Sequence, residues 1–123
     1  MPIDRQAVGQ RGEDLAADHL VGIGYRILER NFRCAAGEID IVAEHQGTLV
    51  VVEVRTRRGA QFGTPAESIT SHKAARLVAL EKHYRMARTG LPQRSRIDVV
   101  SVELGRGSMP ARITVIENAV EDG

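Results

Sequence analysis

The segment spanning residues 37–55 constrains the fold more than any other part of this sequence. Two runs rich in Ile and Val, residues 37–42 and residues 50–55, lie on either side of a Gln-Gly pair at 46–47. Glycine in a two-residue turn supplies the positive φ that a tight hairpin requires. The pattern therefore predicts two antiparallel strands joined by a tight turn.

Acidic side chains occupy positions inside these apolar strands. A two-residue turn sets the register so that Asp40 lies directly opposite Glu53. Glu38 then lies opposite Arg55, and all four side chains project from one face. The other face carries only apolar side chains: Ile39, Ile41, Val52 and Val54. Directly opposed carboxylates have Cβ atoms about 5 Å apart and repel each other, unless a cation lies between them. Because oxygen ligands alone suit Mg²⁺ or Mn²⁺, the hairpin predicts a site for one of these ions.

The composition fits one domain with an ordinary aliphatic core. The chain has 123 residues, of which 42% are hydrophobic and only 3% aromatic. A net charge of +1 excludes a strongly basic nucleic-acid binder but leaves room for a local basic patch. Cys34 is the only cysteine, which excludes an intramolecular disulfide and a cysteine-based zinc site. The four histidines lack metal-binding spacing and are expected on the surface or on helix flanks.

The sequence contains no apolar segment typical of a signal peptide or of a membrane span. The N-terminus lacks the apolar core of a signal peptide, and no apolar run approaches the length of a membrane span. We therefore expect a cytoplasmic protein with no membrane partner. A single domain is predicted over residues 1–123, with its core over about 5–117 and a frayed tail from Glu117 to Gly123.

Periodicity and turn residues predict the order α-β-β-β-α-β-β. The expected elements are a helix over about 4–22, a strand over 25–33, the hairpin described above, a loop over 57–68, a helix of about 17 residues that begins after Thr70 or Ser71, and strands over 95–104 and 112–116. The second helix serves as a crossover, so the strand after it should run parallel to the strand before it. The fold class is therefore α/β, with a mixed sheet flanked by helices. Gly9 and Gly12 inside the first helix suggest either simple tolerance or the close approach of another backbone or a ligand.

The element order and the acids together resemble the PD-(D/E)xK nucleases, which have a restriction-endonuclease-like fold. Within that superfamily the chain resembles the YraN-like bacterial proteins, a largely uncharacterised group similar to archaeal Holliday-junction resolvases. The resemblance covers about residues 5–102. It is carried by Gly9-Gln10-Arg11-Gly12-Glu13, Asn31-Phe32-Arg33, Gly37-Glu38-Ile39-Asp40, Val52-Glu53-Val54-Arg55-Thr56-Arg57, Phe62-Gly63 and Ile97-Asp98-Val99-Val100.

The resemblance implies roles for individual residues. Asp40 and Glu53 match the two acids of the motif, and Glu13 matches an additional metal-binding glutamate of the resolvase-type members. At Arg55 the family pattern has a lysine, and arginine stays protonated, so it cannot accept a proton from water. Lys73 is a candidate for supplying an ammonium group in its place.

Three functions remain open on the sequence. The first is a Mg²⁺- or Mn²⁺-dependent nuclease acting on structured or branched nucleic acid, with DNA favoured over RNA and a homodimer compatible with the resemblance. Its catalytic residues would be Asp40, Glu53 and Arg55, and its phosphate-binding residues Arg57, Arg58, Lys73 and Arg76. The second is a nuclease-like module that binds nucleic acid without cutting it, and the third is a protein-interaction subunit. Asp98, a further strand acid, is assigned no catalytic role, and a salt bridge with a neighbouring arginine is one interpretation of it.

Overall fold

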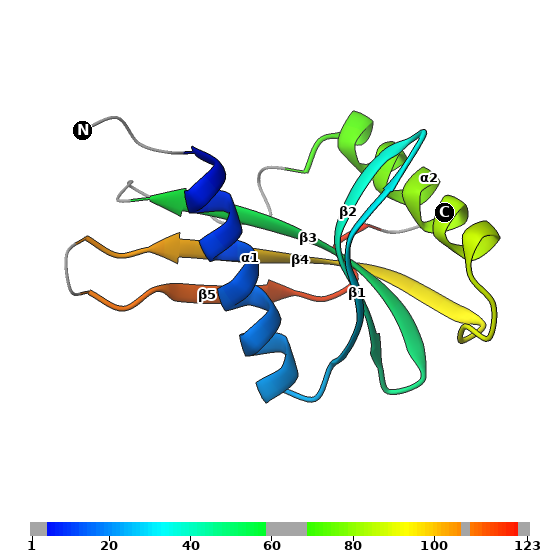
Figure 1. Ribbon diagram of the computed structural model, residues 1–123, viewed down its shortest axis with the longest axis horizontal. Coiled ribbons are helices and arrows are strands. Elements are labelled where there is room, and N and C mark those ends of the chain that lie inside the picture. Colours follow the sequence, from blue (N-terminus) through cyan, green and yellow to red (C-terminus); the bar gives the residue numbers. More distant parts are fainter. Residues whose placement is uncertain (1–4, 59–68, 107–108, 121–123) are drawn as a thin grey trace.

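The computed structural model of the chain describes residues 5–58, 69–106 and 109–120 (Figure 1). Its elements follow the predicted order: α1 (Arg5–Gly22), β1 (Arg26–Cys34), β2 (Gly37–His45), β3 (Thr48–Arg58), α2 (Ser71–Ala87), β4 (Arg94–Leu104) and β5 (Arg112–Ile116). The loop predicted over 57–68 begins later than expected, because β3 continues through Arg58. Its remaining residues, 59–68, which include Phe62-Gly63, lie outside the described part of the chain.

The strands form one mixed sheet in the order β1-β2-β3-β4-β5. The first three make an antiparallel meander, and α2 then carries the chain across so that β4 pairs with β3 in parallel. β5 pairs with β4 in the antiparallel sense at the edge of the sheet. The predicted α/β class and the parallel crossover are confirmed, and this is the arrangement that a restriction-endonuclease-like fold implies.

The predicted hairpin turn is present at Gln46 and Gly47, whose φ angles are 51° and 77°. Positive φ at both central residues matches the twist of the flanking strands, which is the geometry of a type I′ turn. The β2–β3 ladder runs from His45↔Thr48 to Ile41↔Val52, which is the predicted register.

The two helices cover opposite faces of the sheet, so the central strands are buried on both sides (Figure 1). This explains why residues 49–52 form an unbroken apolar run with every side chain fully buried. On the α1 face, Ala16, Ala17 and Leu20 pack against Val50, Val52, Val100 and Val102. On the α2 face, Leu77, Leu80 and Tyr84 pack against Phe32, Leu49 and Val51. Neither described helix is both long and apolar enough to span a membrane.

Gly12 allows α1 to approach β3 closely. A Cβ atom at this position would overlap the side chain of Thr56. A Cβ atom at Gly9, by contrast, would meet nothing within 4 Å. Close approach of another segment is therefore the correct interpretation for Gly12, whereas Gly9 faces open space.

Two predictions about the periphery are wrong. His45 is only 9% exposed and stacks on Tyr25 with ring centroids 4.1 Å apart, because it ends a buried strand next to the turn. The tail is ordered up to Val120, which is 8% exposed in the core on the α2 face. The Ala119 N–H donates to the Ile97 carbonyl at 2.7 Å, so the residues after β5 are held against the sheet. Residues 121–123 lie outside the described range.

Candidate metal centre

Asp40 lies on β2 just beyond the last pair of the β2–β3 ladder. Its Oδ2 atom accepts a hydrogen bond of 2.9 Å from the backbone N–H of Val54, in place of the next ladder bond. The carboxylate lines a groove of about 390 Å³ between α1 and the sheet. The groove is lined by Arg5, Val8, Gly9, Glu13, Asp40, Val54 and Thr56.

The environment of Asp40 disfavours its negative charge. Burial raises the pKa of Asp40 from 3.8 to about 7, although the hydrogen bond from Val54 acts in the opposite direction. The negative charges of Glu53, Glu13 and Glu38 raise the pKa further. A half-buried carboxylate whose ionised form is opposed by burial and by the charges of three other acids is the electrostatic setting that a bound cation would relieve.

Glu13 reaches this groove from α1, directly after the glycine that lets the helix approach β3. It is buried, with 8% of its surface exposed. Its Oε1 atom accepts hydrogen bonds from Arg30 Nε and Nη2, both at 3.1 Å, and from Asn31 Nδ2 at 2.9 Å. Sequence reasoning did not assign a site role to Arg30 or Asn31.

Glu53 projects toward α2, where its Oε1 atom lies 3.1 Å from Nζ of Lys73. Lys73, which the sequence suggested as a source of an ammonium group, therefore does lie beside Glu53. Both side chains are largely shielded from solvent, with 24% of Lys73 and 14% of Glu53 exposed. The pair connects the start of α2 to the middle of β3.

The prediction that one sheet face carries all the acids and the other all the apolar residues is wrong in part. Ile41, Val52 and Val54 do pack on the α1 face, as expected for alternate positions. Ile39 packs instead on the α2 face with Phe32. Alternation fails because the described ladder between β2 and β3 ends at Ile41↔Val52, so the preceding residues of β2 no longer follow the pleat of β3. Asp40 thus faces the groove beside α1, whereas Glu53 faces Lys73 of α2, and the two acids are not an opposed pair on one face.

The predicted cationic residues are spread over two elements. Arg55 and Arg57 lie half-buried on β3, opposite Ser101 and Glu103 of β4, and Arg58 is exposed at the end of the strand. Arg76 is exposed on α2. Glu38, the predicted neighbour of Arg55, accepts a hydrogen bond of 2.8 Å from Arg33 Nε. The roles of these arginines in phosphate binding remain predictions.

The donor chemistry of the groove fits a hard divalent cation, although no metal cage is already assembled. Within residues 5–58, 69–106 and 109–120, no three His, Cys, Asp or Glu side chains are grouped closely enough to hold an ion. Glu13 is engaged by Arg30 and Asn31, and Glu53 by Lys73. An ion at Asp40 would have only oxygen atoms to bind, as Mg²⁺ and Mn²⁺ prefer.

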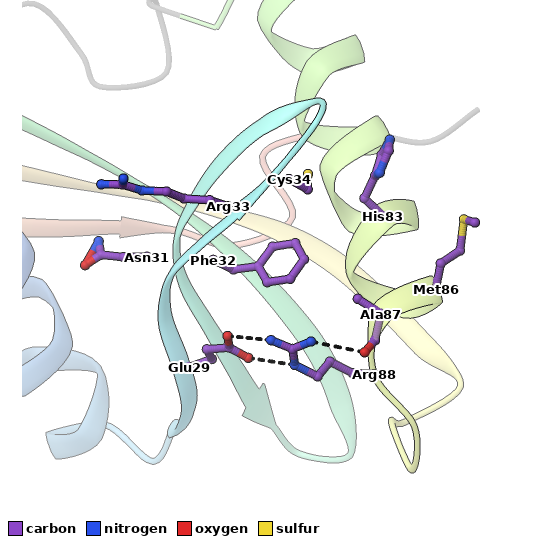
Figure 2. Close-up of a pocket in the computed structure, with 9 residues that line it drawn as sticks. All are labelled: Glu29, Asn31, Phe32, Arg33, Cys34, His83, Met86, Ala87 and Arg88. Carbon is purple, nitrogen blue, oxygen red and sulfur yellow. Dashed lines mark hydrogen bonds and ion pairs between the residues drawn. The ribbon is translucent and has the colours of Figure 1, made fainter.

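A second and larger pocket, of about 560 Å³, lies between β1 and the C-terminal half of α2 (Figure 2). Two of its charged groups, Glu29 and Arg88, are paired with each other, and a third, Arg33, pairs with Glu38 outside the pocket. Arg88 Nε and Nη2 donate to the two oxygens of Glu29 at 3.0 and 2.8 Å, and the guanidinium lies 5.2 Å from the centroid of Phe32. These pairings account for the charges of Glu29, Arg33 and Arg88, and we assign the pocket no role in the chemistry.

Comparison with known proteins identifies the family. The model of the family described as "Uncharacterised protein family UPF0102" matches residues 12–102. The chain belongs to this family. Similar UPF0102 proteins include that of Roseiflexus castenholzii, 50% identical over 120 residues and covering 96% of each chain. That of Moorella thermoacetica is 49% identical over 120 residues, which cover 97% of this chain and 99% of its relative. That of Clavibacter michiganensis is 46% identical over 114 residues, or 93% of this chain and 96% of the relative.

Among solved structures, the UPF0102 chain superposes on SfsA of Pyrococcus furiosus, whose structure is in complex with Ca²⁺. The TM-score is 0.43 and the sequence identity 18%, over 98% of this chain and 66% of that chain. An overlap this loose is no basis for transferring the bound Ca²⁺ to the groove described above. The family assignment confirms the YraN-like resemblance of the sequence, and the chemistry of the site must be argued from its own residues.

Proposed function

We propose that this protein is a Mg²⁺- or Mn²⁺-dependent nuclease that hydrolyses phosphodiesters in structured or branched DNA. The observation that carries the proposal is the position of Asp40, half-buried in a groove that it shares with Glu13, where burial and the charges of neighbouring acids oppose its ionised form. A divalent cation bound at such a site would stabilise the ionised form of the carboxylates. Asp40, Glu13 and Glu53 would hold the ion.

The bound ion would supply the charge that activates a water molecule and offsets negative charge on the phosphoryl group. The chain's own residues would orient the substrate around it. Glu53 would contribute its carboxylate to holding the ion, and the Lys73 ammonium group, which lies 3.1 Å from Glu53, would contact a phosphate oxygen. Arg57, Arg58 and Arg76 would contact backbone phosphates, which position nucleic acid without reading its sequence.

Cleavage of a branched DNA junction in Mn²⁺ is the direct test. We expect nicking by the wild type and its loss in both Asp40→Asn and Glu53→Gln, each of which removes one negative charge with little change in shape. Arg58→Gln is the matched control for loss of a charge outside the acid cluster, and it should weaken DNA binding while leaving the rate at saturating DNA nearly unchanged. Equal cleavage by wild type and Asp40→Asn would contradict the proposal.

Arg55 favours a second candidate function, a nuclease-like module that binds DNA without cutting it. Arginine keeps the positive charge of the expected lysine and its ability to bind phosphate, but it cannot take a proton. Comparing wild type with Arg55→Lys in the same assay separates the two functions. Cleavage that appears only in Arg55→Lys, with salt-sensitive binding by both proteins, would identify a binding module.

A further inference from the structure

Three donated hydrogen bonds converge on a single oxygen atom of Glu13. Arg30 contributes two of them, at 3.1 Å each, and Asn31 contributes the third, at 2.9 Å, all to Oε1. A carboxylate oxygen has two lone pairs, so three donors saturate it. The carboxylate is therefore fixed through one oxygen, while Oε2 accepts no hydrogen bond from the described residues and is available to another ligand.

Arg30 and Asn31 are neighbours in a strand, and regular alternation would send their side chains to opposite faces. Asn31 avoids this with a left-handed backbone, φ 57°. Figure 2 shows its side chain directed from β1 toward α1, whereas the ring of Phe32 points toward α2. The local twist brings two consecutive polar side chains onto the same carboxylate of α1.

The backbone conformation of Asn31 is unusual for its place in the fold. The described chain has two other non-glycine residues with positive φ, Gln46 and Asn118, and both lie in turns. A left-handed residue inside a strand persists only where surrounding interactions maintain it, and asparagine tolerates it better than most residues. The amide of Asn31 provides such interactions, since Nδ2 also lies 3.4 Å from Oε1 of Glu38. Asn31 thus touches two of the three acids whose charges raise the pKa of Asp40.

We infer that Asn31, with Arg30, is a positioning residue that locks Oε1 of Glu13 and presents Oε2 to a divalent cation held at Asp40. The inference rests on the proposed function and extends it to two residues outside the acid motif. A ligand whose free oxygen is already oriented loses less conformational freedom when the ion binds. Mutation of a residue that hydrogen-bonds to a metal ligand commonly weakens metal affinity by about 10- to 100-fold.

A purely structural role would give different behaviour. The Arg30 guanidinium also reaches Asp14, at 2.7 Å, so it would connect β1 to α1 even without the bond to Glu13. Asn31 is neutral, and replacing it changes neither the net charge nor that ion pair. Its substitution therefore reports on orientation of the carboxylate rather than on electrostatics, which makes it the better test.

The experiment measures the Kd of Mn²⁺ by titration calorimetry in wild type and Asn31→Gly. Glycine adopts positive φ without strain, so this change removes the amide and keeps the backbone. We expect Mn²⁺ to bind about tenfold more weakly. Asn118→Gly is the matched control, because it replaces an exposed left-handed asparagine away from the groove, and its Kd should equal that of the wild type.

A double substitution shows whether Asn31 acts through Glu13. In a Glu13→Gln background, Asn31→Gly should weaken Mn²⁺ binding by less than twofold further, and a full additional tenfold loss would overturn the inference.

Arg30→Lys keeps the charge but loses the two-donor geometry, so it should also weaken binding, and it serves as the second variant should Asn31→Gly fail to fold. If the wild type binds Mn²⁺ and both variants bind it equally well, this inference fails alone. If the wild type itself binds no Mn²⁺, the proposed function fails and this inference fails with it.

Discussion

Asp40 and Asp98 are both aspartates inside apolar strands, but they differ in their hydrogen bonds and in the charges around them. Asp98 is fully buried, with both carboxylate oxygens satisfied by donors. Oδ1 accepts from Arg96 Nε at 3.0 Å and from the Asn118 N–H at 2.9 Å. Oδ2 accepts from the Tyr25 hydroxyl at 2.6 Å and from Arg96 Nη2 at 3.2 Å. Asp40 receives one hydrogen bond from the described residues, and the charges that shift its pKa are those of acids, although Arg5 also lines the groove.

The hydrogen-bond partners and counter-charges of a buried acid indicate whether it stabilises the fold. The charge of Asp98 is neutralised by Arg96, and its hydrogen bonds join β4 to Tyr25, just before β1, and to the segment after β5. It is therefore a structural group, and the salt bridge suggested from the sequence is confirmed. Asp40 makes no comparable contribution to stability, because its ionised form is opposed by burial and by like charges. A group that destabilises its own fold is a candidate for a function that needs it.

The largest expected effect comes from the same isosteric change at both positions. In Asp98→Asn, either orientation of the amide places an NH₂ group against an Arg96 N–H, and Arg96 loses its buried counter-charge. We expect the free energy of unfolding to fall by about 3–5 kcal/mol. In Asp40→Asn, the amide oxygen can still accept from Val54, so stability should hold or increase. Urea unfolding in EDTA measures the free energy of unfolding of both variants. Equal losses would contradict the distinction between the two aspartates.

The second effect is a pH dependence of stability that comes from Asp40. The pKa of Asp40 is about 7 in the folded protein and 3.8 without the fold. Between these values the folded protein retains a proton that the unfolded chain has released, so stability decreases as pH rises through this window and levels off above it. Because a pKa unit corresponds to about 1.4 kcal/mol, we expect a decrease on the order of 3 kcal/mol after allowance for partial contact with solvent.

The measurement compares urea unfolding of wild type and Asp40→Asn between pH 5 and pH 8 in EDTA. Subtracting the two curves removes the contributions of other titrating groups, and the difference should shrink toward acid pH. Adding Mn²⁺ at pH 8 should restore stability to the wild type but not to the variant. A flat difference curve would show that Asp40 titrates at an ordinary pKa.

The distinction between the two aspartates was only partly accessible from the sequence. The turn at Gln46 and Gly47 fixed the hairpin register, because few residue pairs suit a two-residue turn. The same register could not show that the ladder ends at the Ile41↔Val52 pair, since a turn fixes how the strands are paired but not how far the pairing extends. The common face predicted for Asp40 and Glu53 failed for that reason.

Arg30 and Asn31 were missed for a related reason. A bulge in β1 between Ile27 and Glu29, together with the left-handed Asn31, changes which side chains face α1. Sequence periodicity assumes regular alternation and therefore assigns the wrong neighbours after an irregularity. An asparagine inside a strand pattern was the available signal, because it is depleted in strands and tolerates positive φ.

A smaller effect separates the hydrogen bond of Asp98 from its ion pair. Burial and the charge of Asp98 raise the pKa of Tyr25 far above its ordinary value, so the hydroxyl remains a donor. Tyr25→Phe removes this donor but keeps the stacking on His45. We expect a loss of about 1–2 kcal/mol in the free energy of unfolding. Tyr84→Phe is the matched control, because its hydroxyl donates to the half-exposed Glu29, at 3.2 Å, and its loss should be smaller. Equal losses would mean that the bond to Asp98 has no special strength.

The smallest effect concerns how strongly the charges of neighbouring acids raise the pKa of Asp40. Lys73 lies 3.1 Å from Glu53, the charged neighbour that most raises the pKa of Asp40. In Lys73→Gln, the charge of Glu53 acts on Asp40 without a counter-charge, so the pKa of Asp40 should rise by less than about one unit. Stability should change by only about 0.5 kcal/mol, because the pair is partly exposed. A carbon NMR titration of the Asp40 carboxyl measures the shift, with Lys82→Gln on the outer face of α2 as the control. A pKa that falls in Lys73→Gln would mean that Lys73 does not shield Asp40 from Glu53, and the ammonium group would then have no part in the electrostatics of the groove.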